Sequence, residues 1–171
     1  MIEYLREDEV YRVGMCIEEA GLDFYTKMAA KADDQGTKRV FRRLAKDEEQ
    51  HLAFFESLEL KTAHGMGSGP AEFDADTSRY VCSLVDGGIF SSLGKMEKLA
   101  RRKFNPEKAL ELALQVEKDA VLYYTEALAV SKKRSTKVAL SRLIDEEKSH
   151  VVQISKRLEN LRKKAAREAR K

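Results

Sequence analysis

Residues 48–51 read EEQH, and the same Glu-x-x-His step returns 99 residues later as EKSH at residues 147–150. Glu18 lies 30 residues before the first step, and Glu117 lies 30 residues before the second. Six side chains of metal-binding type therefore repeat in one fixed register. This pattern is typical of two helix pairs that fold into one four-helix bundle around two metal ions.

The repeat extends beyond these six side chains. When residues 18–55 are aligned with residues 117–154 without gaps, ten of the 38 positions are identical. Other pairs keep their apolar character, as at Phe41 and Leu140. A gap-free internal repeat of this kind indicates that the two halves of the chain fold alike.

The bulk properties suit one helical domain. The chain has 171 residues, of which 36% are charged, and it contains no Trp and only two Pro. A chain of this length is long enough to bury a sizeable core as a single domain, which we expect to span residues 1–171. We expect no membrane span, because no run of 18 apolar residues occurs.

The cysteines and the N-terminus point to the cytoplasm. Cys16 and Cys82 are single cysteines with no C-x-x-C motif, and both are expected to be small buried hydrophobic residues. The first twelve residues, MIEYLREDEVYR, are of mixed charge and unlike a secretory signal. A reducing, cytoplasmic setting is the expectation.

Apolar periodicity and breakers predict four long helices in two hairpins. The first two run from about residue 8 to 32 and from an expected cap at Thr37 to before residue 64. The second pair begins at Asn105-Pro106 and at an expected cap in Ser135-Thr136, and it ends near Leu161. Residues 64–105 form a long crossover, in which residues 75–86 and 91–102 are expected to be short helices. The predicted fold is an all-α four-helix bundle.

The C-terminal stretch 156–171 is strongly basic, with eight Lys or Arg residues against two Glu. Such a stretch can contact nucleic acid or anionic lipid. No aromatic residues are interleaved with the charges, as stacking on bases would require. We therefore expect the solvated end or tail of the last helix and no nucleic-acid partner.

The six repeated side chains form a ligand set of four carboxylates and two imidazoles. Imidazole with carboxylate suits Fe, Mn or Zn better than the all-oxygen shells of Ca or Mg. Four ionised carboxylates carry a charge of −4, which two divalent ions balance. Oxidation of both ions to the trivalent state adds a charge of +2, which a bridging oxide or hydroxide could balance. This ligand set therefore fits two-electron chemistry with dioxygen or peroxide. The predicted metal ligands are Glu18, Glu48, His51, Glu117, Glu147 and His150.

Tyr25 and Tyr124 each lie seven residues after the ligand glutamate of their own helix. Two helical turns place each of them on the same face as that glutamate. They could hydrogen-bond a ligand carboxylate and support catalysis in that way. The alternative is a core tyrosine whose hydroxyl lies at the wall of the bundle.

Several other side chains near the ligands are expected to face solvent or to support the ligands from behind. Glu19, Glu49 and Glu146 adjoin ligands in sequence but lie about 100° away around the helix. Asp119 is a candidate for an additional carboxylate near the site. His64 is expected in a glycine-rich surface loop.

On these residues the chain resembles the rubrerythrin-like branch of the ferritin-like superfamily, over roughly residues 8–160. The resemblance rests on Glu18 with Phe24-Tyr25, on Glu117 with Tyr123-Tyr124, and on the two Glu-x-x-His steps. It implies a ferritin-like bundle with two Fe ions, although the residues themselves leave Mn or Zn open. It also implies a homodimer or larger oligomer, in which the long crossover would permit exchange of hairpins between subunits.

The chain departs from rubrerythrins in two respects. They usually carry a C-terminal rubredoxin domain with paired C-x-x-C motifs, and these 171 residues contain no such motif, so we expect electrons from a separate donor such as a rubredoxin-type protein. Rubrerythrins also have a further Glu three residues after the ligand of the third helix, where it helps iron move during peroxide turnover. That position is Ala120 here, and its repeat partner is Gly21. The hypothesis is that these two small residues leave space for dioxygen, peroxide or water.

The leading functional hypothesis is a di-iron oxidoreductase that reduces hydrogen peroxide or dioxygen, in the manner of an oxidative-stress protein. The main alternative is a ferroxidase that binds and oxidises ferrous iron for storage or delivery. Two further readings stay open: a metal-bound bundle with a structural or sensory role, and a metal-free helical interaction module. Loss of metal on substitution of Glu48 and Glu147 would exclude the last of these.

Overall fold

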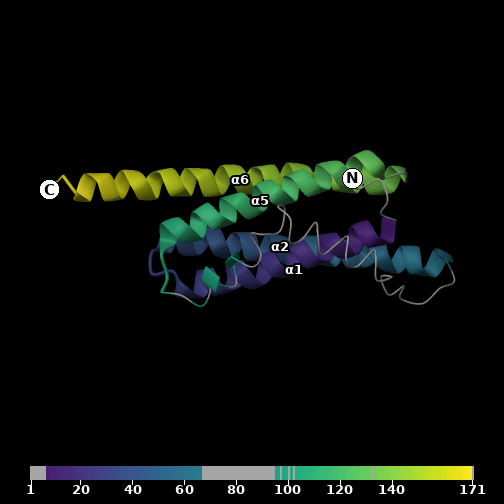
Figure 1. The fold of residues 1–171 in the computed structure, drawn as a ribbon, viewed down its shortest axis with the longest axis horizontal. Coiled ribbons are helices and arrows are strands. Elements are labelled where there is room, and N and C mark those ends of the chain that lie inside the picture. The colour runs from purple at the N-terminus through teal and green to yellow at the C-terminus, as the bar shows by residue number, and fades with distance from the viewer. Residues whose placement is uncertain are drawn as a thin grey trace.

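The computed structural model describes residues 7–66, 95–96, 98–99, 101, 103–131 and 133–170. Four long helices dominate these residues: α1 (Glu7–Lys31), α2 (Gln35–Met66), α5 (Pro106–Val130) and α6 (Arg134–Glu168) (Figure 1). The described residues contain no strand, which confirms the predicted all-α bundle of two hairpins. None of the described helices is both long and apolar enough to cross a membrane.

The two hairpins pack side by side. Helices α1 and α2 pack together, as do α5 and α6, while α2 also contacts α6 and α1 contacts α5. Helices α2 and α5 run in the same direction (Figure 1), so a connection as long as the predicted crossover is needed between them. The short helix predicted at 75–86 lies outside the described residues. Within the one predicted at 91–102, residues 95–96 and 98–99 are helical.

The start of α5 agrees with the prediction, whereas the start of α2 does not. Asn105 caps α5 as expected, because its side chain accepts a hydrogen bond from the Lys108 amide at 2.9 Å. The predicted cap at Thr37 is wrong, because α2 begins at Gln35 and Asp34 accepts from the Thr37 amide at 2.8 Å. The carboxylate satisfies an amide that the first helical turn leaves without a partner.

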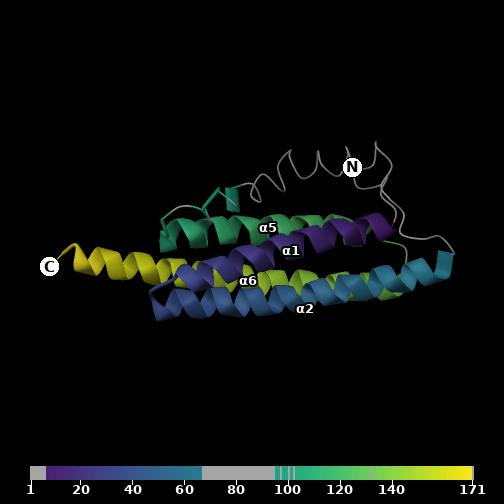
Figure 2. The same cartoon turned by 90° about the horizontal axis from the view of Figure 1, so that it is seen from below.

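Helix α6 differs from the prediction at both ends. It begins at Arg134, and the hydroxyl of the predicted cap residue Thr136 instead shares a 2.8 Å hydrogen bond with Tyr11 of α1. It continues to Glu168, beyond the predicted end at Leu161, so most of the basic stretch is helical. This end projects past the other long helices (Figure 2).

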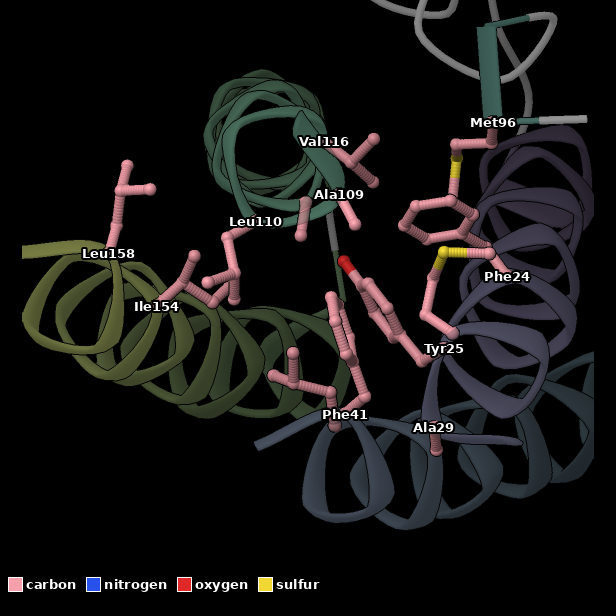
Figure 3. Packing of buried hydrophobic residues seen from close by; sticks show 13 residues of the cluster. Phe24, Tyr25, Ala29, Phe41, Met96, Ala109, Leu110, Val116, Ile154 and Leu158 are labelled. Atoms are coloured by element: carbon pink, nitrogen blue, oxygen red, sulfur yellow. The ribbon is translucent and has the colours of Figure 1, made fainter. Parts of the chain in front are cut away.

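Apolar side chains form two clusters at different heights of the bundle. One gathers around Tyr11, Phe55 and Tyr123. The other gathers around Phe24 and Phe41, where side chains of α1 and α2 face those of α5 and α6 (Figure 3). On every long helix the predicted ligands lie in sequence between residues of the two clusters. The polar layer is therefore enclosed by apolar packing above and below.

Candidate metal centre

Four glutamates and two histidines from all four long helices meet between the two apolar clusters. All six residues are buried, with between 1% and 4% of their surface exposed. Their ligand atoms form two overlapping groups, and within each group these atoms lie within 4.8 Å of one another. The structure thus brings together all six residues that the sequence singled out: Glu18, Glu48, His51, Glu117, Glu147 and His150.

The two groups have the composition of a paired metal site. They share two carboxylates, and each group adds one glutamate and one histidine of its own. A shared carboxylate can bridge two ions, while the unshared residues complete one ion each. One group is Glu18, Glu48, His51 and Glu147, and the other is Glu48, Glu117, Glu147 and His150.

His51 reaches from the cluster to the protein surface. Its Nδ1 atom lies 3.0 Å from Glu147 Oε1 and 3.2 Å from Glu48 Oε2. Its Nε2 atom lies 2.8 Å from Glu146 Oε2, whose side chain is 61% exposed. A carboxylate on the far nitrogen of an imidazole fixes the orientation of the ring and raises its strength as a ligand.

His150 has the same arrangement in the second hairpin. Its Nδ1 atom lies 3.0 Å from Glu147 Oε2 and 3.2 Å from Glu117 Oε2, and its Nε2 atom lies 3.3 Å from Asp47 Oδ2. The sequence analysis missed Asp47, and it expected Glu146 either to face solvent or to support the ligands from behind. The 99-residue repeat could have indicated both residues, because Asp47 and Glu146 are acidic at corresponding positions. Each histidine is therefore held by a carboxylate from the opposite hairpin.

One atom of the cluster is left without a hydrogen bond. Glu147 Oε1 is buried and has no hydrogen-bond partner among the described residues, although His51 Nδ1 is close to it. A buried carboxylate oxygen without a partner is costly, because it has lost its hydration. A cation bound between these carboxylates would satisfy it. The donor set therefore fits two transition-metal ions of the Fe, Mn or Zn kind.

Two tyrosines tie the carboxylates to the opposite hairpin. The Tyr25 hydroxyl on α1 donates to Glu117 Oε1 on α5 at 2.5 Å, and the Tyr124 hydroxyl on α5 donates to Glu18 on α1. Burial and the charge of these glutamates raise both tyrosine pKa values well above 10, so both phenols stay neutral donors. Each tyrosine thus supports a ligand of the other helix rather than of its own.

Without metal, the cluster retains protons. Burial and neighbouring glutamates raise the pKa of Glu48 well above its usual value, and burial with the charge of Glu147 raises that of Glu117 to about 8. Burial alone would lower the pKa of His150, but hydrogen bonds to Glu117 and Glu147 raise it to about 10. Burial would raise the pKa of Glu147, but His150 and His51 hold it far below its usual range. Metal binding must therefore release protons.

A small cavity faces the carboxylates on one side. Its volume is about 10 Å³, roughly the room for one water molecule. Gly21 and Ala120 line it together with Glu48 and Glu117. A Cβ atom at Gly21 would lie 3.5 Å from the Glu48 side chain, so a larger residue would fill this space. The two small repeat partners therefore keep open the space that the sequence suggested.

The remaining candidates do not join the cluster. Glu19 and Glu49 are exposed, and Asp119 accepts a hydrogen bond from the Gln115 side chain at 2.8 Å. The expectation of a buried Cys16 is wrong, because Cys16 is exposed on α1. His64 lies on α2, which reaches Met66, and not in a loop as predicted. The expectation for Cys82 lies outside the described residues.

The raised pKa values predict that the metal-free protein loses stability as the pH rises. Between pH 4.5 and 8 for Glu117, and between pH 6.5 and 10 for His150, the folded state binds more protons than the unfolded state. Stability supplied by these protons is complete at low pH and is lost as the pH passes each folded-state pKa. Urea unfolding in the presence of a chelator should give a lower free energy of unfolding at pH 9 than at pH 6.

The matched variant for this prediction is Glu117→Gln, whose amide does not titrate. It should show a smaller decrease between pH 6 and pH 9 than the unsubstituted protein. An equal or higher free energy of unfolding at pH 9 in the unsubstituted protein would contradict the proton-holding cluster.

The Rubrerythrin family model matches residues 1–59, which include α1, most of α2 and the ligands Glu18, Glu48 and His51. No curated protein and no solved structure matches the chain. The second hairpin repeats the matched ligand positions in sequence and in space. The match confirms the resemblance to the rubrerythrins on the first hairpin, and the fold and the buried cluster are consistent with a rubrerythrin-like, ferritin-like protein.

Proposed function

We propose that this protein is a di-iron carboxylate oxidoreductase that reduces hydrogen peroxide or dioxygen with electrons from a separate donor. The observation that carries the proposal is the pair of overlapping four-residue groups that share Glu48 and Glu147. Two such groups suit two ions that act as a pair. The family match over residues 1–59 favours iron over manganese and zinc.

The charge of the cluster supports two ions. The four glutamates carry −4 once their protons are displaced, and two divalent ions carry +4. The filled centre is then neutral in its reduced form and is compatible with its burial. Bound iron would supply the two electrons that convert peroxide and two protons into two water molecules.

The protein's own residues hold the ligands and restrict access. Tyr25 and Tyr124 fix Glu117 and Glu18 through hydrogen bonds, and Glu146 and Asp47 fix the two histidines. The cavity beside Gly21 admits an oxidant no larger than a few atoms. Apolar packing above and below the ligands limits the access of bulk water from these two sides. A small oxidant therefore has one enclosed place next to the ligands.

The absence of a carboxylate at Ala120 favours a second candidate, a ferroxidase that oxidises ferrous iron for storage or delivery. Rubrerythrins use a glutamate at that position during peroxide turnover, and here the position lines the small cavity. Such a protein would react with dioxygen and release its iron, whereas a peroxidase would cycle with its iron retained. The two candidates differ in the oxidant that reacts faster.

The proposed function is tested with the iron-loaded protein, reduced under anaerobic conditions and mixed with peroxide or dioxygen in a stopped-flow spectrometer. We expect about two irons per chain and faster oxidation by peroxide than by dioxygen. Glu48→Gln and Glu147→Gln should each slow oxidation by more than about 100-fold, because even residues that only support ligands cost roughly 10- to 100-fold.

The matched control for these ligand variants is Glu49→Gln, which changes an exposed neighbour of Glu48. It should bind iron and react like the unsubstituted protein. Faster oxidation by dioxygen, with iron released afterwards, would establish the ferroxidase instead. Failure to take up any metal would rule out both candidates.

The tyrosine hydrogen bonds predict a loss of metal affinity in Tyr25→Phe and Tyr124→Phe. Each change removes the donor to one ligand carboxylate, which should weaken metal binding by roughly tenfold. Zn²⁺ titration against a competing chelator measures this affinity. The matched control is Tyr123→Phe, because the Tyr123 hydroxyl donates to the Val10 carbonyl and not to a ligand. Equal affinities in all three variants would contradict the role of these tyrosines.

A further inference from the structure

A groove on the surface leads from solvent to one of the two histidines. It lies between α2 and α6 and has a volume of about 690 Å³. Phe54, Val138 and Leu143 supply apolar surface, and the ring of His51 forms part of the wall. The volume lies within the range of about 300–1,000 Å³ that small-molecule sites occupy. On the opposite side of the His51 ring, the Nδ1 atom contacts the carboxylates of Glu48 and Glu147.

Two arginines line the groove, and among the described residues neither is paired with a carboxylate. They are Arg134 and Arg142, which line it together with Glu146, and Glu146 contacts His51. Arg43, the repeat partner of Arg142, lies 3.6 Å from Asp47, four residues further along α2. The corresponding residue on α6 is Glu146, which contacts His51 at 2.8 Å. The groove therefore presents two arginines against one carboxylate, where the other half of the repeat has a paired arginine.

The equivalent place in the other half of the repeat is filled by the protein itself. Ser135 lines the groove, and its repeat partner is Gly36. The guanidinium of Arg157 lies so close to Gly36 that a Cβ atom there would be 2.6 Å from it. Arg157 is held there by Asp34 and by Thr37, to which it donates at 3.0 Å. Leu58 occupies the repeat position of Arg157, so the arginine that fills the other half has no counterpart at this position.

We propose that this groove binds a planar aromatic electron carrier with an anionic group, of the dihydroflavin class, and that its electrons enter the centre past His51. The arginines would bind the anionic group, and Phe54 with Val138 would contact the aromatic rings. A carrier in this place would be one imidazole ring away from the cluster. The binding step stands on the groove alone, whereas the electron step rests on the proposed function.

The electron balance closes with the oxidant already named. A dihydroflavin gives two electrons and two protons and becomes the oxidised flavin. Hydrogen peroxide takes up the two electrons and two protons and becomes two water molecules. The carrier would give up its electrons and protons at the groove, whereas the oxidant would take them up in the cavity beside Gly21. The two reactants would therefore bind at separate places.

Binding is tested on the metal-free protein with flavin mononucleotide, whose fluorescence reports the complex. Arg134→Ala with Arg142→Ala should weaken binding at least about tenfold, the loss expected when a charge-assisted hydrogen bond disappears. Val138→Glu should do the same, because it places a negative charge in the groove. Both arginines are exposed and Val138 is 48% exposed, so these changes leave the core intact.

Two controls sharpen the binding test. Arg39→Ala replaces an exposed arginine of α2 at the repeat position of Val138 and should leave the affinity unchanged. Riboflavin, which lacks the phosphate, should bind the unsubstituted protein roughly tenfold more weakly and be insensitive to the double arginine change. Absence of flavin binding, or equal affinities in all variants, would overturn the proposal.

The electron step is tested with the iron-loaded, oxidised protein and reduced flavin mononucleotide under anaerobic conditions. At low flavin concentration the double arginine variant should be reduced about tenfold more slowly, while peroxide should oxidise both reduced proteins at equal rates. Equal rates of reduction would overturn the groove as the entry point. Peroxide turnover without flavin binding would overturn this inference alone, and failure to take up iron would overturn the proposed function and the electron step.

Discussion

Four glutamates buried within a few ångströms of one another are the constraint on which the rest of this structure depends. Ionised carboxylates at such distances repel strongly in a medium of low dielectric constant. Without metal the cluster can exist only by holding protons, as the raised pKa values of Glu48 and Glu117 show. With two divalent cations the same layer becomes neutral. The fold therefore stabilises an arrangement whose charge is balanced only by protons or by metal.

The polar layer is also where the two hairpins are joined. Tyr25 and Tyr124 reach across to glutamates of the opposite hairpin, and each histidine contacts an acidic residue of the opposite hairpin. The apolar clusters add contacts above and below, including the hydrogen bond between Tyr11 and Thr136. Because the tyrosine links and the histidine links come in repeat-related pairs, loading the site should tighten both hairpins together. The repeat departs from this symmetry at the surface, where Arg157 covers one half and a groove marks the other.

The sequence was sufficient for the architecture and for the ligands because both depend on spacing. A 99-residue repeat with Glu-x-x-His on a helical period places its side chains on one face, whatever the details of packing. Partners across the bundle could not be read in this way, since Tyr25 and Glu117 meet only through the packing of α1 on α5. The predicted helix caps at Thr37 and Thr136 were wrong. Each threonine hydroxyl instead has a hydrogen-bond partner across the bundle. The groove beside His51 depends on which side chains leave space and has no sequence signal.

The proposed function requires that the two overlapping groups each hold one metal ion. Anomalous X-ray diffraction from crystals of the iron-loaded protein, recorded at the iron absorption edge, tests this directly. We expect two peaks within the bundle, one beside His51 and one beside His150, with Glu48 and Glu147 between them. Peaks at other places, or a fully ordered cluster with no peak, would contradict the account.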